Sequence, residues 1–416
     1  FQSPPRSASV AAMIRRFPRM PLPPKRLLAF ALALPLAGCA TAVDYGKVPH
    51  SAYVADARCT AQAGAEVDTA ALPLFFVTSR LPDCRTPDIR LTNHRGDRIR
   101  YGRFAAPHDR KVDGKTRFLT PLAFQEAGDW WAGLQAETDR RQGRVLLYVH
   151  GYRETFETTS KDAAQIARMT GFDGPIVEYS WPSQGKLLSY AVDETNMYHD
   201  VRNFRLFLKA LAERPWVKEI VVVSHSLGAR LVIPAIAYVD RTAPSADSSN
   251  ISNIILASPD FDRETFERDI ANDVLAPARV ARDRRITAYV SRSDKALAAS
   301  RALHGYPRLG SPYCFDPFEA ADLRAKGLPE RCYAAAIPGL TIVDTTDISR
   351  GSTGHSDFLR SALACMDFVD MIRGKRSRPE RTPTHLAHVF RLAPDPQMPS
   401  RLDEAICNRI PDGEKD

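Results

Sequence analysis

Short apolar runs, each bounded by turn residues, alternate with helical patterns through most of the chain. The run at 145–149 (VLLYV) is continuously apolar and lies between Gly143 and Gly151. A continuous run of this kind is typical of a strand that is buried on both faces. Strands that alternate with helices predict a parallel sheet covered by helices on both sides. The sequence therefore predicts an α/β fold with a mostly parallel central sheet.

The same patterns set the bounds of the expected elements. Strands are expected at 74–78, 98–104, 145–149, 175–179, 219–223, 254–257, 286–290 and 340–343, and helices at 159–169, 197–212, 226–239 and 357–373. The stretch 98–104 alternates polar and apolar residues, as a half-exposed edge strand does. The folded domain is expected at 72–374, with an irregular insertion at 300–338 and a C-terminal extension rich in proline and arginine at 375–416.

Residues 1–39 have the order of charged and apolar residues of a secretory signal. A basic stretch precedes an apolar run at 27–36, which is shorter than the ~20 apolar residues that a membrane span needs. The run ends in the letters LAGC, which resemble the lipobox of bacterial lipoproteins. The resemblance implies cleavage before Cys39 and acylation of its thiol, with 40–71 as a polar tether.

The location of the positive charge bears on the partners of the chain. The net charge is +8, but residues 1–38 hold six basic residues and no acidic one, which leaves +2 for the rest. The basicity therefore belongs mostly to the leader, and no nucleic-acid partner is expected.

Six cysteines remain besides Cys39. Sequence neighbours would pair as Cys59–Cys84, Cys314–Cys332 and Cys365–Cys407, and an even number of cysteines in an exported chain favours disulfides, although other pairings remain open. None of these cysteines has metal-ligand spacing, so no metal is expected.

A serine lies between a buried strand and a helix in the segment 221–228 (VVVSHSLG). The segment matches the nucleophile elbow G-x-S-x-G, with Ser224 in place of the first glycine. A small side chain suffices there, because the strand turns sharply into the helix. Such a turn would raise the Ser226 hydroxyl above the sheet edge and point the Leu227 N–H toward a developing oxyanion. The alternative is a serine that caps an ordinary helix.

A serine hydroxyl becomes a good nucleophile only with a base and an acid that orients the base. In this arrangement the acid and then the histidine follow the serine on loops after later strands. Asp294 follows the expected strand at 286–290, and His355 lies in a glycine-rich loop after the last expected strand. They are the expected acid and base, with Asp260, after an earlier strand, as the alternative acid.

An oxyanion hole needs a second backbone donor from the loop after an earlier buried strand. His150, Gly151 and Tyr152 directly follow the expected strand at 145–149. Gly151 permits a close turn, so the Tyr152 N–H is the expected partner of the Leu227 N–H. The alternative is a glycine that only ends the strand.

Several of these segments resemble a family of bacterial esterase/lipase-like α/β-hydrolases of unknown function. The matching segments are FFVTSR at 75–80, YVHGY at 148–152, YSWPS at 179–183, SHSLG at 224–228, ASPD at 257–260, YVSRSDKAL at 289–297 and GHSDF at 354–358. Family members typically have methionine at the position of Leu227, where only the backbone is used. The resemblance implies an α/β-hydrolase fold and a catalytic triad of Ser226, Asp294 and His355.

This resemblance implies a serine carboxylester hydrolase that works through an acyl-enzyme, without a cofactor, on a small ester or a lipid-like substrate. A lipid, thioester or amide hydrolase with the same triad is one alternative, and a non-catalytic binding lipoprotein is another. Trp181 and Tyr190 either line an acyl pocket or pack in the core. The lipobox, followed by Ala40, implies a lipid-anchored protein of the cell envelope, at the outer membrane. The sequence predicts neither the natural substrate nor the oligomeric state.

Overall fold

The computed structural model describes most of the chain beyond the tether. The described residues are 72–83, 90–106, 123–242, 249–311, 325, 337–349, 354–375, 381–384 and 388–393. The lipobox Cys39 lies outside them. Within them, no helix is both long enough and apolar enough to cross a membrane.

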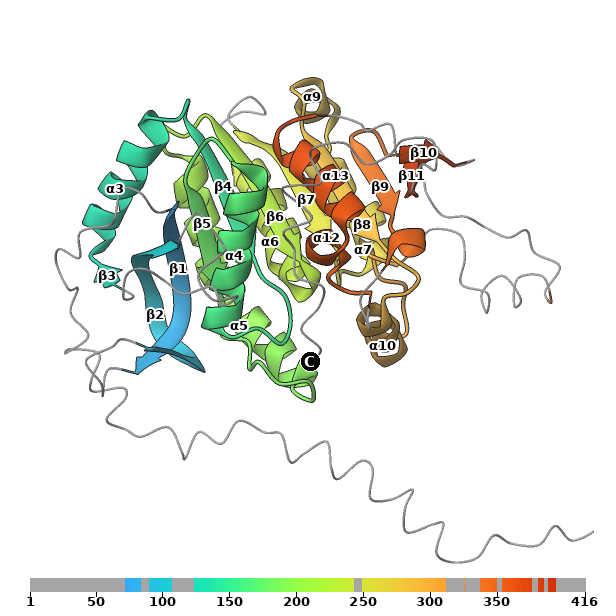
Figure 1. Ribbon diagram of the computed structural model, residues 1–416, viewed down its shortest axis with the longest axis horizontal. Helices are drawn as coiled ribbons and strands as arrows, with labels where there is room; N and C mark the ends of the chain where they lie inside the picture. The colour runs from blue at the N-terminus through green and yellow to red at the C-terminus, as the bar shows by residue number, and fades with distance from the viewer. Residues whose placement is uncertain are drawn as a thin grey trace, which may run out of the picture. The chain divides into compact units, whose positions relative to one another are not determined.

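One sheet runs through the described part of the chain, with the strand order β10-β11-β9-β8-β7-β6-β4-β5-β1-β2-β3 (Figure 1). The strands are β1 (Leu72–Asp83), β2 (Arg90–Ala106), β3 (Ala123–Gln125), β4 (Arg144–Val149), β5 (Ile176–Ser180), β6 (Glu219–His225), β7 (Ile251–Ala257), β8 (Arg285–Val290), β9 (Leu340–Asp344), β10 (Arg381–Pro383) and β11 (Val389–Leu392). All neighbours from β11 through to β1 are parallel, and the pairs β1–β2, β2–β3 and β10–β11 are antiparallel. The predicted, mostly parallel sheet is confirmed.

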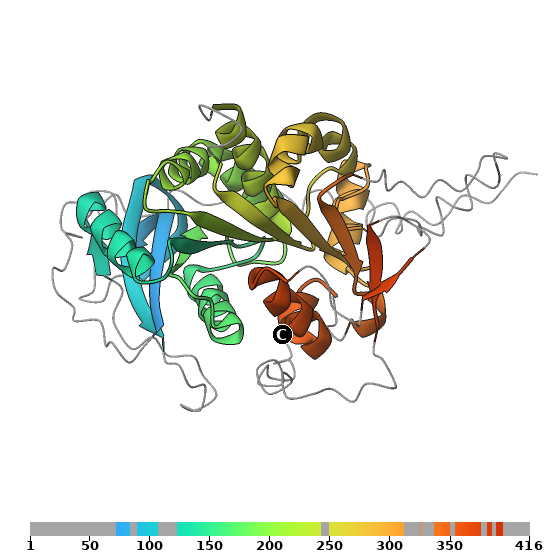
Figure 2. The ribbon, with the colours of Figure 1, turned by 90° about the horizontal axis from the view of Figure 1, so that it is seen from above.

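Helices cover both faces of this sheet (Figure 2). They are α3 (Ala127–Asp139), α4 (Phe156–Thr170), α5 (Tyr190–Ala212), α6 (Ala229–Thr242), α7 (Arg263–Thr265), α8 (Ala271–Val274), α9 (Pro277–Ala281), α10 (Lys295–His304), α12 (Asp357–Arg360) and α13 (Ala362–Ile372). Apolar residues of α3, α5 and α6 belong to the core on one face, and those of α4 and α13 belong to the core on the other. The sheet is therefore the middle of three layers.

Burial on both faces explains the continuous apolar run of β4. Val145, Leu147 and Val149 face α5 and α6, whereas Leu146 and Tyr148 face α4. All five side chains are completely buried. Burial of each such aliphatic side chain stabilises the fold by ~1.5–3 kcal/mol.

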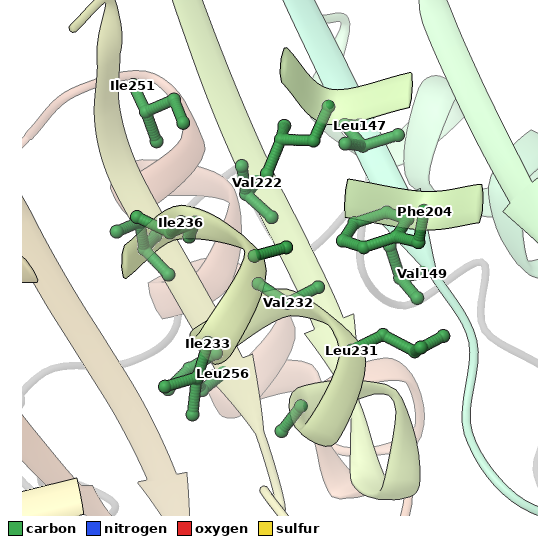
Figure 3. Packing of buried hydrophobic residues seen from close by; sticks show 14 of the residues in the cluster. Leu147, Val149, Phe204, Val222, Leu231, Val232, Ile233, Ile236, Ile251 and Leu256 are labelled. Carbon is green, nitrogen blue, oxygen red and sulfur yellow. The ribbon is translucent and has the colours of Figure 1, made fainter. Parts of the chain in front are cut away.

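The core between the sheet and α6 is built from neighbouring strands. Figure 3 shows Val222 of β6 and Leu256 of β7 close to Val232, Ile233 and Ile236 of the helix. Val232 and Ile236 are four residues apart and Ile233 and Ile236 three apart, so the three positions lie on one face of the α-helix. This packing fixes the start of α6, and with it the turn that follows β6.

The structure differs from the sequence prediction at several elements. The stretch 98–104 alternates in burial as predicted, but the edge-strand assignment is wrong, because β3 pairs with the outer side of β2 through Tyr101 and Gln125. Helix α5 begins at Tyr190 rather than at 197, since its first turns carry buried polar residues that weaken the apolar periodicity. Strands β10 and β11 come from the predicted C-terminal extension, and β11 pairs with β9.

Of the six cysteines besides Cys39, only Cys365 lies within the described residues. It is completely buried on α13. The pairings expected from sequence neighbours stay predictions.

Candidate active site

The turn between β6 and α6 holds Ser226 in a strained backbone conformation. The φ angle of Ser226 is 50°, in the left-handed region that residues other than glycine seldom adopt, at a cost of order 1–3 kcal/mol. A single 3₁₀ turn, Ser226–Gly228, then leads into α6. The predicted sharp strand-to-helix turn is therefore present, and Ser226 lies at its tip.

Two glycines allow the loop after β4 to touch this turn. A Cβ atom on Gly228 would lie 2.4 Å from the carbonyl oxygen of His150, and one on Gly151 would lie 2.7 Å from Cβ of Ser226. Neither position can hold a larger residue without movement of the backbone. Gly151 therefore lies directly against Ser226. Tyr152 directly follows Gly151, and Leu227 directly follows Ser226, so the backbone N–H groups of both lie next to this contact.

The expected acid and base are in contact. The Nδ1 atom of His355 lies 2.8 Å from Oδ2 of Asp294. Because a carboxylate only accepts hydrogen bonds, Nδ1 carries the proton and Nε2 remains as the basic nitrogen. Burial lowers the pKa of His355, but the charge of Asp294 and its hydrogen bond outweigh burial and raise the pKa above its usual value. The other oxygen of Asp294 accepts the N–H of Leu297 at 2.9 Å and caps α10.

His355 approaches the turn through the residue before Ser226. The ring centroids of His225 and His355 are 4.8 Å apart, and His225 Nε2 donates to the carbonyl oxygen of His355 at 3.0 Å. Among the described residues, no hydrogen bond joins Ser226 Oγ to the ring of His355. Catalytic hydrogen bonds are often long in unliganded sites and shorten when substrate binds. The histidine therefore lies beside the turn, one residue away from Ser226.

Asp260, the alternative acid, belongs to a separate buried network. Its Oδ1 accepts hydrogen bonds from Ser300 Oγ and Arg308 Nε, both at 2.7 Å. Its Oδ2 accepts from the hydroxyl of Tyr190 and lies 3.2 Å from Arg230 Nη2. Burial raises the pKa of Asp260, but the charges of Arg230 and Arg308 outweigh burial and lower it. Both carboxylate oxygens therefore have donors, and none of them is a histidine.

Trp181 and Tyr190 have different surroundings. Trp181 is completely buried, its ring lies parallel to that of His150 with centroids 4.8 Å apart, and its Nε1 donates to the His150 carbonyl at 3.0 Å. The core-packing alternative therefore holds for Trp181, which supports the start of the loop after β4. Tyr190 is partly exposed and lies edge-on to Tyr152, with ring centroids 5.3 Å apart.

Two buried charged residues near the site carry no motif that assigns them a role. Arg80 lies in β1, beyond the apolar residues 74–77, and Asp193 lies in the first turn of α5; both are completely buried. The only signals for Arg80 are its place at the end of the family-like segment FFVTSR and its charge shortly after an apolar run. Asp193 gives no signal, since it precedes the region of clear helical periodicity.

A parallel sheet between two helical layers, with a strained serine at a strand-to-helix turn, defines the α/β-hydrolase fold. Residues 131–373, more than half of the chain, match the family described as "Alpha/beta hydrolase of unknown function (DUF900)". The chain belongs to this family. No protein of curated function matches it.

Solved structures of esterases resemble the chain weakly. ESTFA in its iron-lacking apo form is 12% identical with a TM-score of 0.30, and the match covers 82% of this chain and 96% of that one. Est1E from Butyrivibrio proteoclasticus is 11% identical with a TM-score of 0.32, and the match covers 73% and 100%. The butyrate-bound esterase Est2 from Thermogutta terrifontis is 15% identical with a TM-score of 0.27, and the match covers 64% and 90%. At these TM-scores the likeness adds nothing to the family assignment.

Proposed function

We propose that this hydrolase is a serine carboxylesterase in which Ser226 is the nucleophile, His355 the general base and Asp294 the orienting acid. The observation that carries the proposal is the 2.8 Å contact between His355 and Asp294 beside a strained serine turn. Ser226 follows β6, Asp294 follows β8 and His355 follows β9, and these strands run parallel. Their loops therefore leave the same edge of the sheet, where α/β proteins bind ligands.

The proposed reaction is a two-step acyl transfer. Nε2 of His355 takes the proton of Ser226 as its oxygen attacks the ester carbonyl, and Asp294 stabilises the imidazolium that forms. The backbone N–H groups of Tyr152 and Leu227 donate to the oxyanion, and His355 returns the proton to the leaving alcohol. Water, activated by the same nitrogen, then hydrolyses the acyl-enzyme. Each oxyanion donor contributes ~2.7–4 kcal/mol to such a transition state.

Exposed apolar side chains favour a substrate with an apolar acyl group. Leu187 and Leu188, in the loop before α5, are 65% and 78% exposed, and Leu303 and Tyr306, around the end of α10, are 64% and 57% exposed. Among the described residues only two further large apolar side chains are exposed to this degree or nearly so. Clustering of exposed apolar residues on two segments indicates a binding surface more than scattered exposure does.

Aromatic contacts connect both segments to the proposed oxyanion loop. The hydroxyl of Tyr152 donates to the carbonyl of Leu187, and the ring of Tyr152 contacts that of Tyr190. The ring of Tyr190 also lies 5.9 Å from that of His304, next to Leu303. The apolar side chains thus flank the position where the ester carbonyl would bind. A lipid-like ester therefore fits this site better than a small polar one.

We also propose that the enzyme is lipid-anchored through Cys39 in the cell envelope, at the outer membrane. The charged stretch, the short apolar run and the LAGC letters of the leader support this anchor. A non-catalytic binding protein is the weaker alternative, because each position that the chemistry needs holds a competent residue.

A fluorophosphonate probe tests the proposed nucleophile, since it reacts only with an activated serine hydroxyl. Wild-type protein should be labelled at Ser226 and should hydrolyse p-nitrophenyl butyrate. Ser226→Ala should lose both properties while its circular dichroism spectrum is unchanged. Labelling that persists in the alanine variant, or a folded wild type without labelling and without hydrolysis, would contradict the proposal.

A further inference from the structure

The carboxylate of Asp193 accepts hydrogen bonds from the loops after β4 and β5. Its Oδ2 accepts the backbone N–H of Arg153 at 3.1 Å and the hydroxyl of Ser183 at 2.5 Å. Its Oδ1 accepts the backbone N–H of Gln184 at 2.7 Å. One buried carboxylate therefore binds N–H groups of both loops.

The guanidinium of Arg80 donates hydrogen bonds to the same two loops. Its Nη2 donates to the carbonyl of Glu154 at 2.9 Å, and its Nη1 donates to the carbonyl of Ser183 at 3.0 Å. Its Nε donates to Ser180 Oγ at 3.0 Å. Burial lowers the pKa of Arg80 to about 10, so the side chain is still charged at neutral pH.

The hydrogen bonds of Arg80 and Asp193 go mainly to the two loops, and among the residues that the structure describes the two side chains do not bond to each other. In the described part of the chain, Arg80 and Asp193 form no ion pair with each other, and their hydrogen bonds go to backbone, hydroxyl and amide groups. Burial of a charge is costly unless hydrogen bonds compensate for it. The hydrogen bonds to the two loops therefore compensate for the burial of both charges. Both loops leave the edge of the sheet that carries Ser226.

The loop after β4, which Arg80 and Asp193 hold, includes the proposed oxyanion donor, the Tyr152 N–H. Gly151, on one side of Tyr152, is seated against Ser226. Arg153, on the other side, has a φ angle of 66°, in the strained left-handed region. The bond from its N–H to Asp193 holds that conformation, so the peptide that carries the Tyr152 N–H is fixed at both ends.

We infer that Arg80 and Asp193 form a clamp that positions the Tyr152 N–H toward the oxyanion. Both are positioning residues, because they act through the loop and do not touch the substrate. The catalytic part of this inference rests on the proposed esterase function. The structural part, the grip on the loop, stands without it.

Asp193→Asn is the most direct test. The amide replaces one acceptor oxygen by a donor that faces another N–H or a hydroxyl, so at least one bond to the loops is lost. The oxyanion forms only in the transition state, so kcat for p-nitrophenyl butyrate should fall while KM stays within about threefold. A misplaced donor should cost ~10–100-fold in kcat, less than removal of the donor.

Asp200→Asn is the matched control. Asp200 is also completely buried on α5, but it accepts from Asn203 at 3.0 Å on its own helix. Its variant should lose stability and keep kcat. Ser183→Ala is a milder second variant, because this hydroxyl links Asp193 to the N–H of Glu154 at 2.9 Å, and it should lower kcat in the same direction.

Hydrogen exchange of the peptide 150–155 separates the clamp from the chemistry. Exchange in this peptide should be faster in Asp193→Asn than in wild type and unchanged in Asp200→Asn. Unchanged exchange in Asp193→Asn, or an equal loss of kcat in both variants, would overturn the inference. An inactive wild type would overturn the proposed function alone, and the exchange result would still decide whether the clamp exists.

Discussion

The side chains of Asp294 and His355 meet at 2.8 Å although 61 residues separate them in the sequence. Asp294 divides its two oxygens between tasks: Oδ1 caps α10 through the N–H of Leu297, and Oδ2 contacts the histidine. The cap fixes the carboxylate, and the carboxylate fixes the ring. A single residue thus joins the loop after β8 to the loop after β9.

This division makes Asp294→Asn an informative variant. Asparagine is as good an N-cap as aspartate, so α10 should keep its start and the free energy of unfolding should change little. The amide N–H₂ would then face Nδ1 of His355 and favour the wrong tautomer, which should lower kcat by ~10⁴. Steady-state kinetics and thermal unfolding measure the two effects.

Asp260→Asn is the control for the alternative acid. It should keep kcat within about tenfold of wild type but lose stability, since breaking a buried network with Arg230 and Arg308 costs ~3–5 kcal/mol. If Asp260→Asn were the inactive variant and Asp294→Asn the active one, the acid would follow β7 instead of β8.

The raised pKa of His355 sets the acid limb of the pH profile. The base must be neutral, so activity should rise with pH as His355 loses its proton, with a midpoint above its ordinary pKa of 6.5. In Asp294→Asn the raising charge is gone and burial remains, so the midpoint should move to lower pH. The dependence of kcat/KM on pH between about 5 and 9 measures both midpoints. A wild-type midpoint below 6.5, or no shift in the variant, would contradict this assignment.

Gly151→Ala tests the contact between the two loops. The added Cβ would lie 2.7 Å from Cβ of Ser226 and 3.0 Å from the carbonyl of His225, so the oxyanion loop must move away. We expect kcat to fall ~10–100-fold because a donor moves out of position. Gly128→Ala on α3 is the control: nothing lies within 4 Å of its Cβ, and alanine should stabilise the helix by up to ~1 kcal/mol without changing kcat. Equal kcat for the two variants would mean that the loop after β4 does not supply an oxyanion donor.

The parts of the fold that the sequence predicts well are those with local causes. The apolar run of β4 and the S-x-S-x-G turn each need only a few neighbouring residues to be recognised. Arg80 could not be assigned a role in this way, because its hydrogen bond to Ser180 spans 100 residues. Asp193 is hidden for a second reason: its partners lie in loops, where no periodicity marks a buried position. The contact of Asp294 with His355 was open to prediction only because the order of strands places their loops together.

The length preference for acyl chains tests the apolar surface. Leu188→Ser should lower kcat/KM for p-nitrophenyl octanoate about fivefold to tenfold relative to the acetate, since a lost apolar contact of this size costs ~1 kcal/mol or more. Leu206→Ser, at an exposed apolar position on α5 itself, is the control and should leave the ratio unchanged. A ratio that is unchanged in Leu188→Ser would leave the esterase intact but remove the case for an apolar acyl group at this loop.

Cys39 is the proposed lipid anchor, and its acylation would decide where the enzyme works. Acylation of a cleaved N-terminal cysteine would leave the domain tethered by the polar residues 40–71, and two or more acyl chains anchor a protein stably whereas one does not. Because the proposed catalytic residues all lie after residue 150, Cys39→Ser should keep kcat unchanged. The variant should, however, take up no radiolabelled palmitate and should leave the membrane fraction, while wild type is labelled and fractionates with the outer membrane. If wild type and variant are both unlabelled and both soluble, the LAGC letters are coincidental and the enzyme is not lipid-anchored through this residue.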